Sequence, residues 1–297
     1  MMIIGSFFSV TVFAATMSIE VRQPVDEKKA AEIVAWIKST ANDMKLAYGR
    51  FPNPAASIVI IPTAENSWGS DSPVIFGRVT RRDGETVELF VDPKRPIEDF
   101  YTDWTATHEF SHLMLPLLNQ RYRWISEGFA SYYQNVLMSR AGHYTPEFAW
   151  QRLTEGFDRG RKSRPELSPN EAAAGGIRNA RMKVYWSGAA IALLADTELR
   201  ERSGGKESLD TVLGQLQACC LPSKKRWSGL RLFEKLDSFL DTPVFMPLYR
   251  KYAYEEGFPV LAPLLAELGV STNDDGTIKL QSNTSMAAVR AAISATQ

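Results

Sequence analysis

The sequence predicts an α+β fold with a small N-terminal antiparallel sheet and a mostly helical C-terminal lobe. Three runs rich in Ile, Val and Phe lie within the first hundred residues, at 57–61, 73–79 and 87–91, and such runs are typical of strands. After Pro96, apolar residues recur every three or four positions, which is the spacing of amphipathic helices. With 297 residues, the chain can bury a large core in one domain or in two lobes that face a cleft.

The N-terminal part is expected to begin with a helix and to continue as a sheet. Between 26 and 50, Ile33, Val34 and Ile37 recur at helical spacing, and Phe-Pro-Asn-Pro at 51–54 ends that helix. The segment Arg-Arg-Asp-Gly at 81–84 favours a hairpin turn, because Gly after Asp accepts a positive φ. We therefore assign residues 16–100 to an N-terminal α/β part.

Helices are predicted to dominate the rest of the chain. We expect them at 103–115, 125–139, 145–157, 182–202, 207–218, 229–240 and 243–255. The stretch 159–179, rich in Gly, Arg, Pro and Ser, is predicted to be an exposed loop. Its basic residues, and the later run Lys224-Lys225-Arg226, are predicted to be solvated surface. Residues 101–270 thus form a helical part, and 271–297 end the chain as a short strand and a helix.

The first fifteen residues are interpreted as a possible signal peptide. Residues 2–15 are apolar and uncharged, have the length of a signal-peptide core and end on the small residues Ala14 and Ala15. They are too short to cross a bilayer as a helix, so we expect no stable membrane span. Cleavage would make the protein periplasmic or secreted. The alternative, a buried first strand of the mature fold, would leave it cytoplasmic.

The charge balance argues against nucleic acid as a partner. Lys plus Arg equals Asp plus Glu, 34 against 34, so the formal net charge is zero, and a basic face that attracts nucleic acid is not expected. The two cysteines, Cys219 and Cys220, are adjacent. Because neighbouring residues rarely reach disulfide geometry, we expect small apolar side chains at a helix end and no disulfide framework.

Two of the three histidines lie in the segment His108-Glu109-Phe110-Ser111-His112, which has helical character. Residues four apart on an α-helix are rotated by about 40° and lie one turn apart, so both imidazoles can reach one metal ion. Glu109 lies beside that face, where its carboxylate can accept a proton from a metal-bound water. The third histidine, His143, is placed in a loop and left out of the site.

A third ligand is offered by Glu127, in the segment Trp-Ile-Ser-Glu-Gly-Phe-Ala-Ser-Tyr-Tyr at 124–133. Pro116 ends or bends the first helix. Ser126 is expected to be the N-cap of the next helix, with Glu127 in its first turn. Two antiparallel helices can then bring Glu127 to the histidine pair. A zinc ion held by His, His and Glu keeps a fourth position for water, as a catalytic site requires.

These segments resemble the gluzincin metallopeptidases, because H-E-x-x-H followed by W-x-x-E-G-x-A-x-Y-Y is similar to the pattern of that group. Among gluzincins, the chain looks most like the catalytic domain of the glycyl aminopeptidase family. Two further segments carry the resemblance: Val-Tyr-Trp-Ser-Gly-Ala-Ala at 184–190, and 200–210 with its Ser-Gly-Gly-Lys-Glu-Ser-Leu-Asp run. The resemblance covers roughly residues 100–270 and implies a thermolysin-like zinc peptidase domain.

Residue by residue, the resemblance implies three ligands of one zinc ion, namely His108, His112 and Glu127. It implies Glu109 as the general base and Tyr185 as the donor to the developing oxyanion, a role suited to a neutral phenol. The aminopeptidases of the family hold the free amino group of the substrate with an acidic residue. Its nearest counterpart, Phe-Gly-Arg-Val at 76–79, has Arg instead. Aminopeptidase and endopeptidase activity both stay open.

The sequence therefore predicts a zinc metallopeptidase that acts on peptide or protein substrates, with a metal-bound water activated by Glu109. An edge strand around 74–79 or 87–91 is expected to bind the substrate backbone by β-addition. Two alternatives stay open: a catalytically inactive binding or scaffold protein with the gluzincin fold, and a zinc hydrolase of a non-peptide or other substrate, such as an epoxide. Against the first, both histidines and both glutamates are present.

Overall fold

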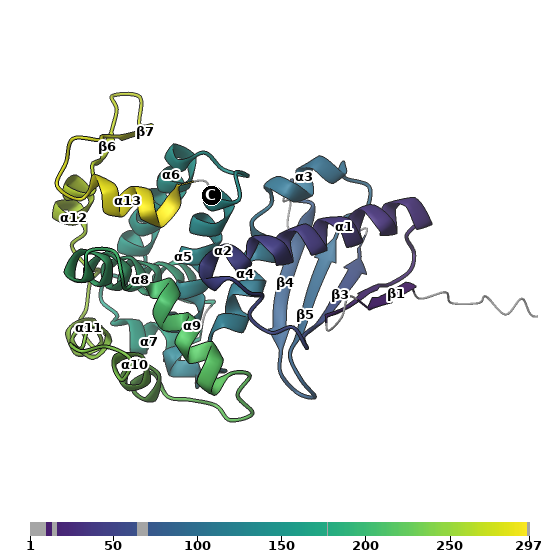
Figure 1. Cartoon of the computed structure of the whole chain (residues 1–297), viewed down its shortest axis with the longest axis horizontal. Coiled ribbons are helices and arrows are strands. Elements are labelled where there is room, and N and C mark those ends of the chain that lie inside the picture. Colours follow the sequence, from purple (N-terminus) through teal and green to yellow (C-terminus); the bar gives the residue numbers. More distant parts are fainter. Residues whose placement is uncertain (1–9, 14–16, 64–70, 177, 296–297) are drawn as a thin grey trace, which may run out of the picture.

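The computed structural model describes residues 10–13, 17–63, 71–176 and 178–295. It is a mixed α+β molecule in which one sheet lies beside a larger group of helices (Figure 1). The sheet has the strand order β1-β2-β3-β5-β4, with bounds Val10–Phe13, Ser18–Val21, Ser57–Pro62, Val74–Thr80 and Thr86–Val91 for β1 to β5. The predicted α+β class, with a small sheet and many helices, is therefore confirmed.

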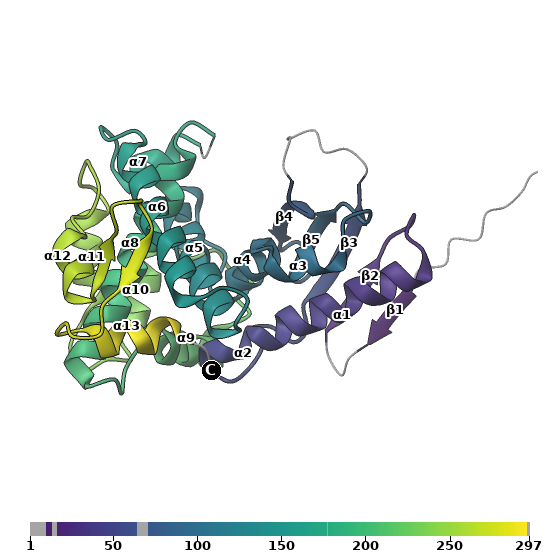
Figure 2. The ribbon, with the colours of Figure 1, turned by 90° about the horizontal axis from the view of Figure 1, so that it is seen from above.

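The sheet is mixed, so the prediction of an antiparallel sheet was wrong. β2 pairs with β3 and β3 with β5 in parallel, whereas β1–β2 and β4–β5 are antiparallel. The cause is α1 (Glu27–Asp43), which connects β2 to β3. A helical crossover returns the chain in its original direction, so the two strands it joins run parallel. Figure 2 shows α1 lying along the sheet.

The predicted hairpin between β4 and β5 is present, with Gly84 at φ 114°. Its turn also ties the sheet to the helices. Arg81 pairs with Glu85 at 2.6 Å and donates to the carbonyl oxygens of His112, at 2.6 Å, and Leu115, at 3.1 Å. These bonds fix the end of β4 against the segment that carries His112.

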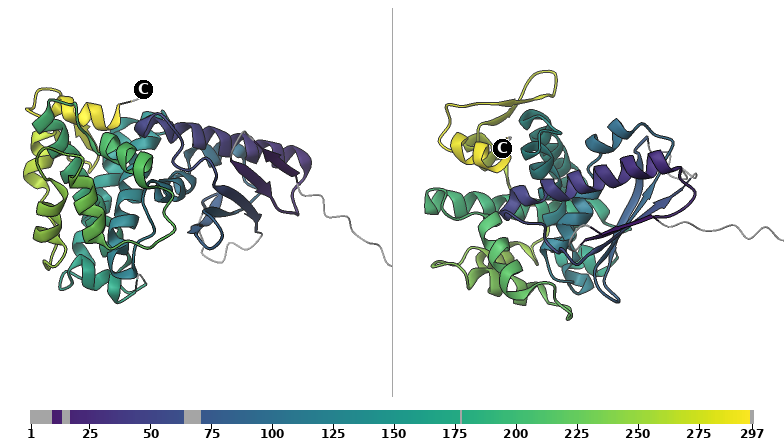
Figure 3. Two further views of the ribbon diagram at one scale, coloured as in Figure 1. Left: turned by 60° about the horizontal axis from the view of Figure 1, so that its bottom comes forward. Right: turned by 45° about the vertical axis from the view of Figure 1, so that its right-hand side comes forward.

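Helices make up most of the rest of the described chain. In the N-terminal half these are α2 (Lys45–Tyr48), α3 (Ile97–Thr102), α4 (Thr105–Ser111) and α5 (Arg123–Arg140), with the 3₁₀ turns η1 (His112–Met114) and η2 (Gln120–Tyr122). They are followed by α6 (Pro146–Lys162), α7 (Pro169–Ala174), α8 (Arg181–Ser203), α9 (Leu209–Cys220), α10 (Gly229–Asp237) and α11 (Phe245–Tyr252). The chain ends with α12 (Ala262–Glu267), the small hairpin β6 (Val270–Thr272) and β7 (Ile278–Leu280), and α13 (Ala287–Ser294). Figure 3 shows α13 against the helical group.

The predicted exposed loop at 159–179 is only partly a loop. Helix α6 continues to Lys162, where Arg159 and Lys162 suit the negative end of the helix dipole. Helix α7 then begins after Ser168, whose side chain forms a capping box with Glu171. Ser-Pro-Asn-Glu at 168–171 is a helix-start signal in the sequence.

Helices α5 and α8 cross at two glycines, and this crossing forms the centre of the helical part. A Cβ at Gly188 would lie 1.9 Å from the carbonyl oxygen of Trp124, and one at Gly128 would lie 2.2 Å from Cα of Gly188. The two backbones can approach this closely only because neither position carries a side chain. The crossing brings Tyr185 on α8 next to Glu127 on α5.

The predicted signal peptide is only partly covered by the structure. Residues 10–13 form β1, which pairs with β2, and the remainder of residues 2–15 lies outside the described residues. Among the helices that the structure describes, none combines the length and apolar character needed to cross a membrane.

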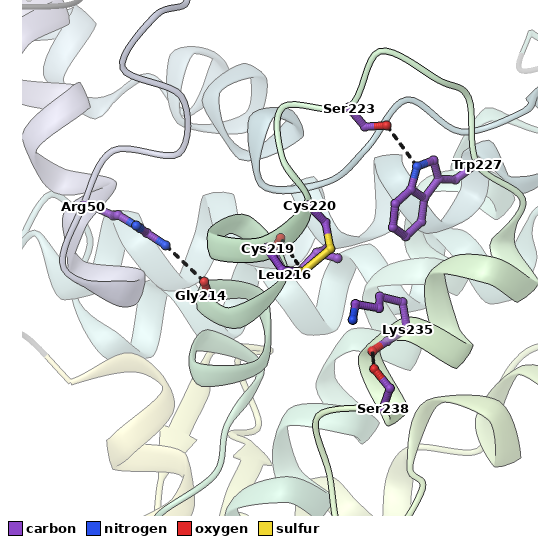
Figure 4. The surroundings of a disulfide bond; sticks show 9 residues. All are labelled: Arg50, Gly214, Leu216, Cys219, Cys220, Ser223, Trp227, Lys235 and Ser238. Atoms are coloured by element: carbon purple, nitrogen blue, oxygen red, sulfur yellow. Dashed lines mark hydrogen bonds between the residues drawn. A yellow bond between two sulfur atoms is a disulfide. The ribbon is translucent and has the colours of Figure 1, made fainter.

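Cys219 and Cys220 form a disulfide between adjacent residues, contrary to the expectation of free thiols. The pair lies at the end of α9 (Figure 4), where Leu221 has an extended backbone. Both cysteines belong to the last turn of α9, and the chain leaves helical geometry directly after them.

Candidate metal centre

The two histidines of the H-E-x-x-H segment lie one turn apart, as predicted. His108 is in α4 and His112 begins η1, and their ring centroids are 4.9 Å apart. Helix α4 lies at the junction of the sheet and the helical part (Figure 1). Both imidazoles are buried, with 3% and 9% of each residue exposed.

Glu127 on α5 completes a three-residue cluster with the histidines. Its Oε2 lies 3.4 Å from Nε2 of His108 and 3.5 Å from Nε2 of His112. Within the described part of the chain, these three residues form the one group of His, Cys, Asp and Glu side chains able to hold a metal ion, with ligand atoms within 4.8 Å of one another. Two imidazoles and a carboxylate suit zinc.

Ser126 is not the N-cap of the second helix, as had been expected. Helix α5 begins earlier, at Arg123, directly after η2, and has no side-chain cap. Glu127 is therefore in the second turn. Ser126 instead lies inside the helix, and its hydroxyl is 3.0 Å from Nδ1 of His112.

Three neighbouring side chains orient the cluster, namely Gln134, Arg123 and the Ser126 hydroxyl beside His112. Nδ1 of His108 lies 2.7 Å from Oε1 of Gln134, and an amide oxygen can only accept, so Nδ1 carries the proton and Nε2 offers its lone pair. Arg123 donates to Oε1 of Glu127 at 2.9 Å, which leaves Oε2 directed at the histidines. This donor set fits a metal ion: each ligand has one atom held by a neighbour and the other free to coordinate.

Glu127 is held in its ionised form. Burial works to raise the pKa of its carboxyl, but the charge of His112 and hydrogen bonds with both histidines outweigh burial and hold the pKa well below its ordinary value. A permanently ionised carboxylate is the form that ligates a metal ion.

Glu109 points into the site without joining the cluster. It is 7% exposed, and burial raises the pKa of its carboxyl above the ordinary value, against the opposing charges of His112 and His108. Strand β4 comes close to it at Gly77, where a Cβ would lie 2.5 Å from Cγ of Glu109. Because Gly77 has no side chain, the Glu109 side chain can occupy the space beside β4.

Tyr185 stacks on His108, with ring centroids 5.7 Å apart and planes at 11°. Burial raises the pKa of its phenol well above the ordinary value, and the negative charge of Glu127 raises it further. The phenol therefore keeps its proton at neutral pH and can act as a hydrogen-bond donor.

A pocket of about 380 Å³ opens over these residues. Its wall combines the end of β4, the site residues, the segment after η1 and one arginine from the α9–α10 connection: Phe76, Gly77, Arg78, Val79, Arg81, Glu109, His112, Leu117, Leu118, Gln120, Arg123, Ser126, Glu127, Tyr185 and Arg226. Of the two strands considered for substrate binding, β5 lies between β3 and β4, whereas β4 lies at the edge. The pocket is therefore next to an edge strand.

Sequence reasoning overlooked the residues that orient the cluster. Gln134 follows Glu127 by seven positions, two helical turns along α5, and this spacing could have identified it as a residue on the same face. Ser126 was noticed and given a different role. His143, left out of the site, is hydrogen-bonded to Asp43 at 2.9 Å and does not line the pocket.

Comparison with known proteins matches residues 117–191 to the M61 glycyl aminopeptidase family. That range contains Glu127 and Tyr185. No curated protein matches the sequence. The solved structures that match have low sequence identity, so their likeness concerns the fold.

An aminopeptidase N family protein from Idiomarina loihiensis is similar with a TM-score of 0.64 at 15% identity, over 94% of this chain and 53% of that chain. An M1 zinc metallopeptidase from Deinococcus radiodurans is similar with a TM-score of 0.51 at 14% identity, over 85% of this chain and 52% of that chain. Leukotriene A4 hydrolase from Saccharomyces cerevisiae is similar with a TM-score of 0.56 at 14% identity, over 84% of this chain and 40% of that chain. The chain thus spans about half the length of the first two and less of the third.

Family match and fold agree with the motifs in the sequence. The H-E-x-x-H segment lies just before the matched range, and the structure brings it to the glutamate inside that range. The resemblance to gluzincin metallopeptidases, and among them to the glycyl aminopeptidase family, is therefore confirmed.

Proposed function

We propose that this protein is a zinc-dependent peptidase with Glu109 as its general base. The observation that carries the proposal is the convergence of His108, His112 and Glu127 at one end of a pocket that Glu109 and Tyr185 also line. Three protein ligands leave one coordination position open, which separates catalytic zinc sites from structural ones. The family match to glycyl aminopeptidases supports peptides as the substrate class.

The ligands would be Nε2 of His108, Nε2 of His112 and Oε2 of Glu127, the three atoms that face one another in the structure. Gln134 and Arg123 hold these ligands in place through their second atoms. Zinc, when bound, acts as a Lewis acid that polarises the scissile carbonyl and lowers the pKa of a water.

Glu109 accepts a proton from the attacking water and then passes it to the departing amine. Its buried position raises the pKa of the carboxyl above the ordinary value, which favours uptake of a proton from water. The phenolic O–H of Tyr185 donates a hydrogen bond to the oxygen that gains charge as the tetrahedral intermediate forms. The edge strand β4 offers backbone groups for an extended peptide.

Metal removal tests the proposal directly. We expect the purified protein to contain one zinc per chain by elemental analysis, and a chelator to abolish cleavage of a peptide library. Adding back one equivalent of zinc should restore cleavage, and mass spectrometry of the products distinguishes removal of N-terminal residues from internal cleavage. Bound zinc without cleavage of any peptide would favour the scaffold or a different hydrolase. Cleavage that survives complete zinc removal would refute the zinc mechanism.

Tyr185→Phe should lower kcat by roughly 10²–10³-fold, the effect of removing one oxyanion donor. Zinc content should stay unchanged, because Tyr185 is not one of the three residues in the ligand cluster. Tyr254→Phe is the matched control, since Tyr254 is 60% exposed and does not line the pocket. Equal rates for both variants would remove Tyr185 from the mechanism.

A further inference from the structure

Arg226 belongs to a basic run predicted to be solvated surface; it is exposed, and it also lines the pocket over the metal cluster. The segment 221–228 connects α9 to α10 and is pinned to the pocket wall by backbone hydrogen bonds. Trp227 donates to the carbonyl of Leu117 at 2.9 Å and accepts from the amide of Asn119 at 3.0 Å. The indole of Trp227 also donates to Ser223 at 3.0 Å (Figure 4). The arginine is therefore presented by a fixed segment.

Four arginines line the pocket, and three of them have carboxylate partners. Arg78 pairs with Glu88, Arg81 with Glu85, and Arg123 with Glu127. These three charges are balanced within the protein. These three arginines hold other side chains of the protein in position. Their charges are therefore not available to bind a charged ligand.

Arg226 differs, since among the residues that the structure describes no carboxylate lies within 4.0 Å of its guanidinium. Its side chain donates once, to the carbonyl of Leu118 at 3.3 Å. The remaining N–H groups are free to bind a ligand at the rim of the pocket. A guanidinium presents its donors in a planar fork that matches the two oxygens of a carboxylate.

The acids of the pocket do not neutralise Arg226. Glu127 is engaged by the two histidines and by Arg123. Glu109 is buried beside Gly77, and the charges that influence its carboxyl come from His112, His108, Glu127 and Arg123. One unbalanced positive charge thus remains on the pocket wall.

We infer that Arg226 is a specificity-determining residue that binds a carboxylate of the substrate. This inference rests on the proposed peptidase function and adds a substrate class to it. The carboxylate can come from an Asp or Glu side chain near the cleaved bond or from the C-terminus of a short peptide. Both sources offer the same two oxygens, so the experiment must separate them.

The test uses matched peptides that differ in one group. One pair has Glu or Gln at a position beside the cleaved bond, and a second pair ends in a free carboxylate or in an amide. We expect the protein to cleave the charged member of one pair about 10-fold better in kcat/KM, since a hydrogen bond to a charged group contributes about one power of ten at an exposed site. Which pair shows the difference identifies the source.

Arg226→Gln should abolish this preference, mainly by raising KM for the charged peptide to the value of its neutral partner. Lys225→Gln is the matched control, because it removes a neighbouring exposed charge that does not line the pocket. A preference that survives Arg226→Gln, or that Lys225→Gln removes equally, would overturn the inference, as would equal cleavage of charged and neutral peptides.

A binding measurement separates failure of this inference from failure of the proposed function. Titration calorimetry with the same peptides, on protein that carries Glu109→Gln, needs no turnover. Suppose that no peptide is cleaved but Arg226→Gln weakens binding of the charged peptide about 10-fold. The carboxylate-binding role of Arg226 would then be supported although the proposed peptidase function had failed. Equal affinity for charged and neutral peptides in that assay would refute it.

Discussion

Glu109→Gln is expected to lower kcat/KM for peptide cleavage by roughly 10²–10⁴-fold, the usual contribution of a general base. Glutamine has nearly the same shape as glutamate, so it should fit the space left beside Gly77. Its amide cannot take a proton from water at neutral pH. Zinc should stay bound with one ion per chain, because the three residues in the ligand cluster are unchanged.

The measurement combines steady-state kinetics with elemental analysis on the same preparation. Glu256→Gln provides a control for loss of a carboxylate, since Glu256 is exposed and does not line the pocket. A Glu109→Gln protein that cleaves peptides at the wild-type rate would remove the proposed base. A variant that has lost zinc would show instead that Glu109 helps to hold the metal.

The core of the candidate metal centre could be predicted because its two histidines follow a helical repeat. His108 and His112 are four residues apart, and this spacing places both rings on one face of the segment formed by α4 and η1. Glu127 lies on another helix, so only the pattern around it suggested that it would approach the histidines. Its exact approach depends on how α4 packs against α5, which no local pattern in the sequence reveals.

The sheet was harder to predict, and the error has an identifiable source. The helix at 26–50 was recognised, but strand β2 before it was not, because its four residues are too few to show a clear pattern. Without β2, α1 looked like an isolated N-terminal helix. With β2 present, α1 becomes the crossover between two strands, and the parallel pairing with β3 follows from that connection.

Arg226 shows the converse limit of sequence reasoning. Runs of Lys and Arg in a polar connection are usually solvated, and Lys224, Lys225 and Arg226 are indeed exposed. Arg226 nevertheless lines the pocket, because the next residue, Trp227, pairs with Leu118, more than a hundred positions earlier in the chain. Such a long-range pairing cannot be inferred from the composition of the run.

Behind the metal centre, α5 is joined to α8 and α9 by a buried ion network. Asp210 accepts hydrogen bonds from Arg140 at 2.9 Å, Arg200 at 2.8 Å and Tyr133 at 2.9 Å. A second carboxylate, Asp196, accepts from Arg200 at 2.9 Å and from the hydroxyl of Tyr132 at 2.7 Å. The network therefore fixes the helix that carries Glu127.

Asp210→Asn is expected to lower the free energy of unfolding by about 3–5 kcal/mol, the usual cost of removing one partner from a buried ion pair. Arg140 is 1% exposed and, among the described residues, would have no carboxylate partner left, only neutral acceptors such as the carbonyl oxygens of Ile293 and Leu46. In urea unfolding, the midpoint should fall while the slope stays constant. Asp274→Asn, at an exposed position, is the control and should change stability by less than about 0.5 kcal/mol.

The unpaired charge, rather than the lost hydrogen bonds, should account for most of this effect. Adding Arg140→Met to Asp210→Asn removes that charge, so the double variant should be less destabilised than the sum of the two single variants. Additive effects would mean that Arg140 and Asp210 do not act as a pair. A loss in Asp210→Asn no larger than in the control would mean that water reaches the arginines and that the network does not hold α5 in place.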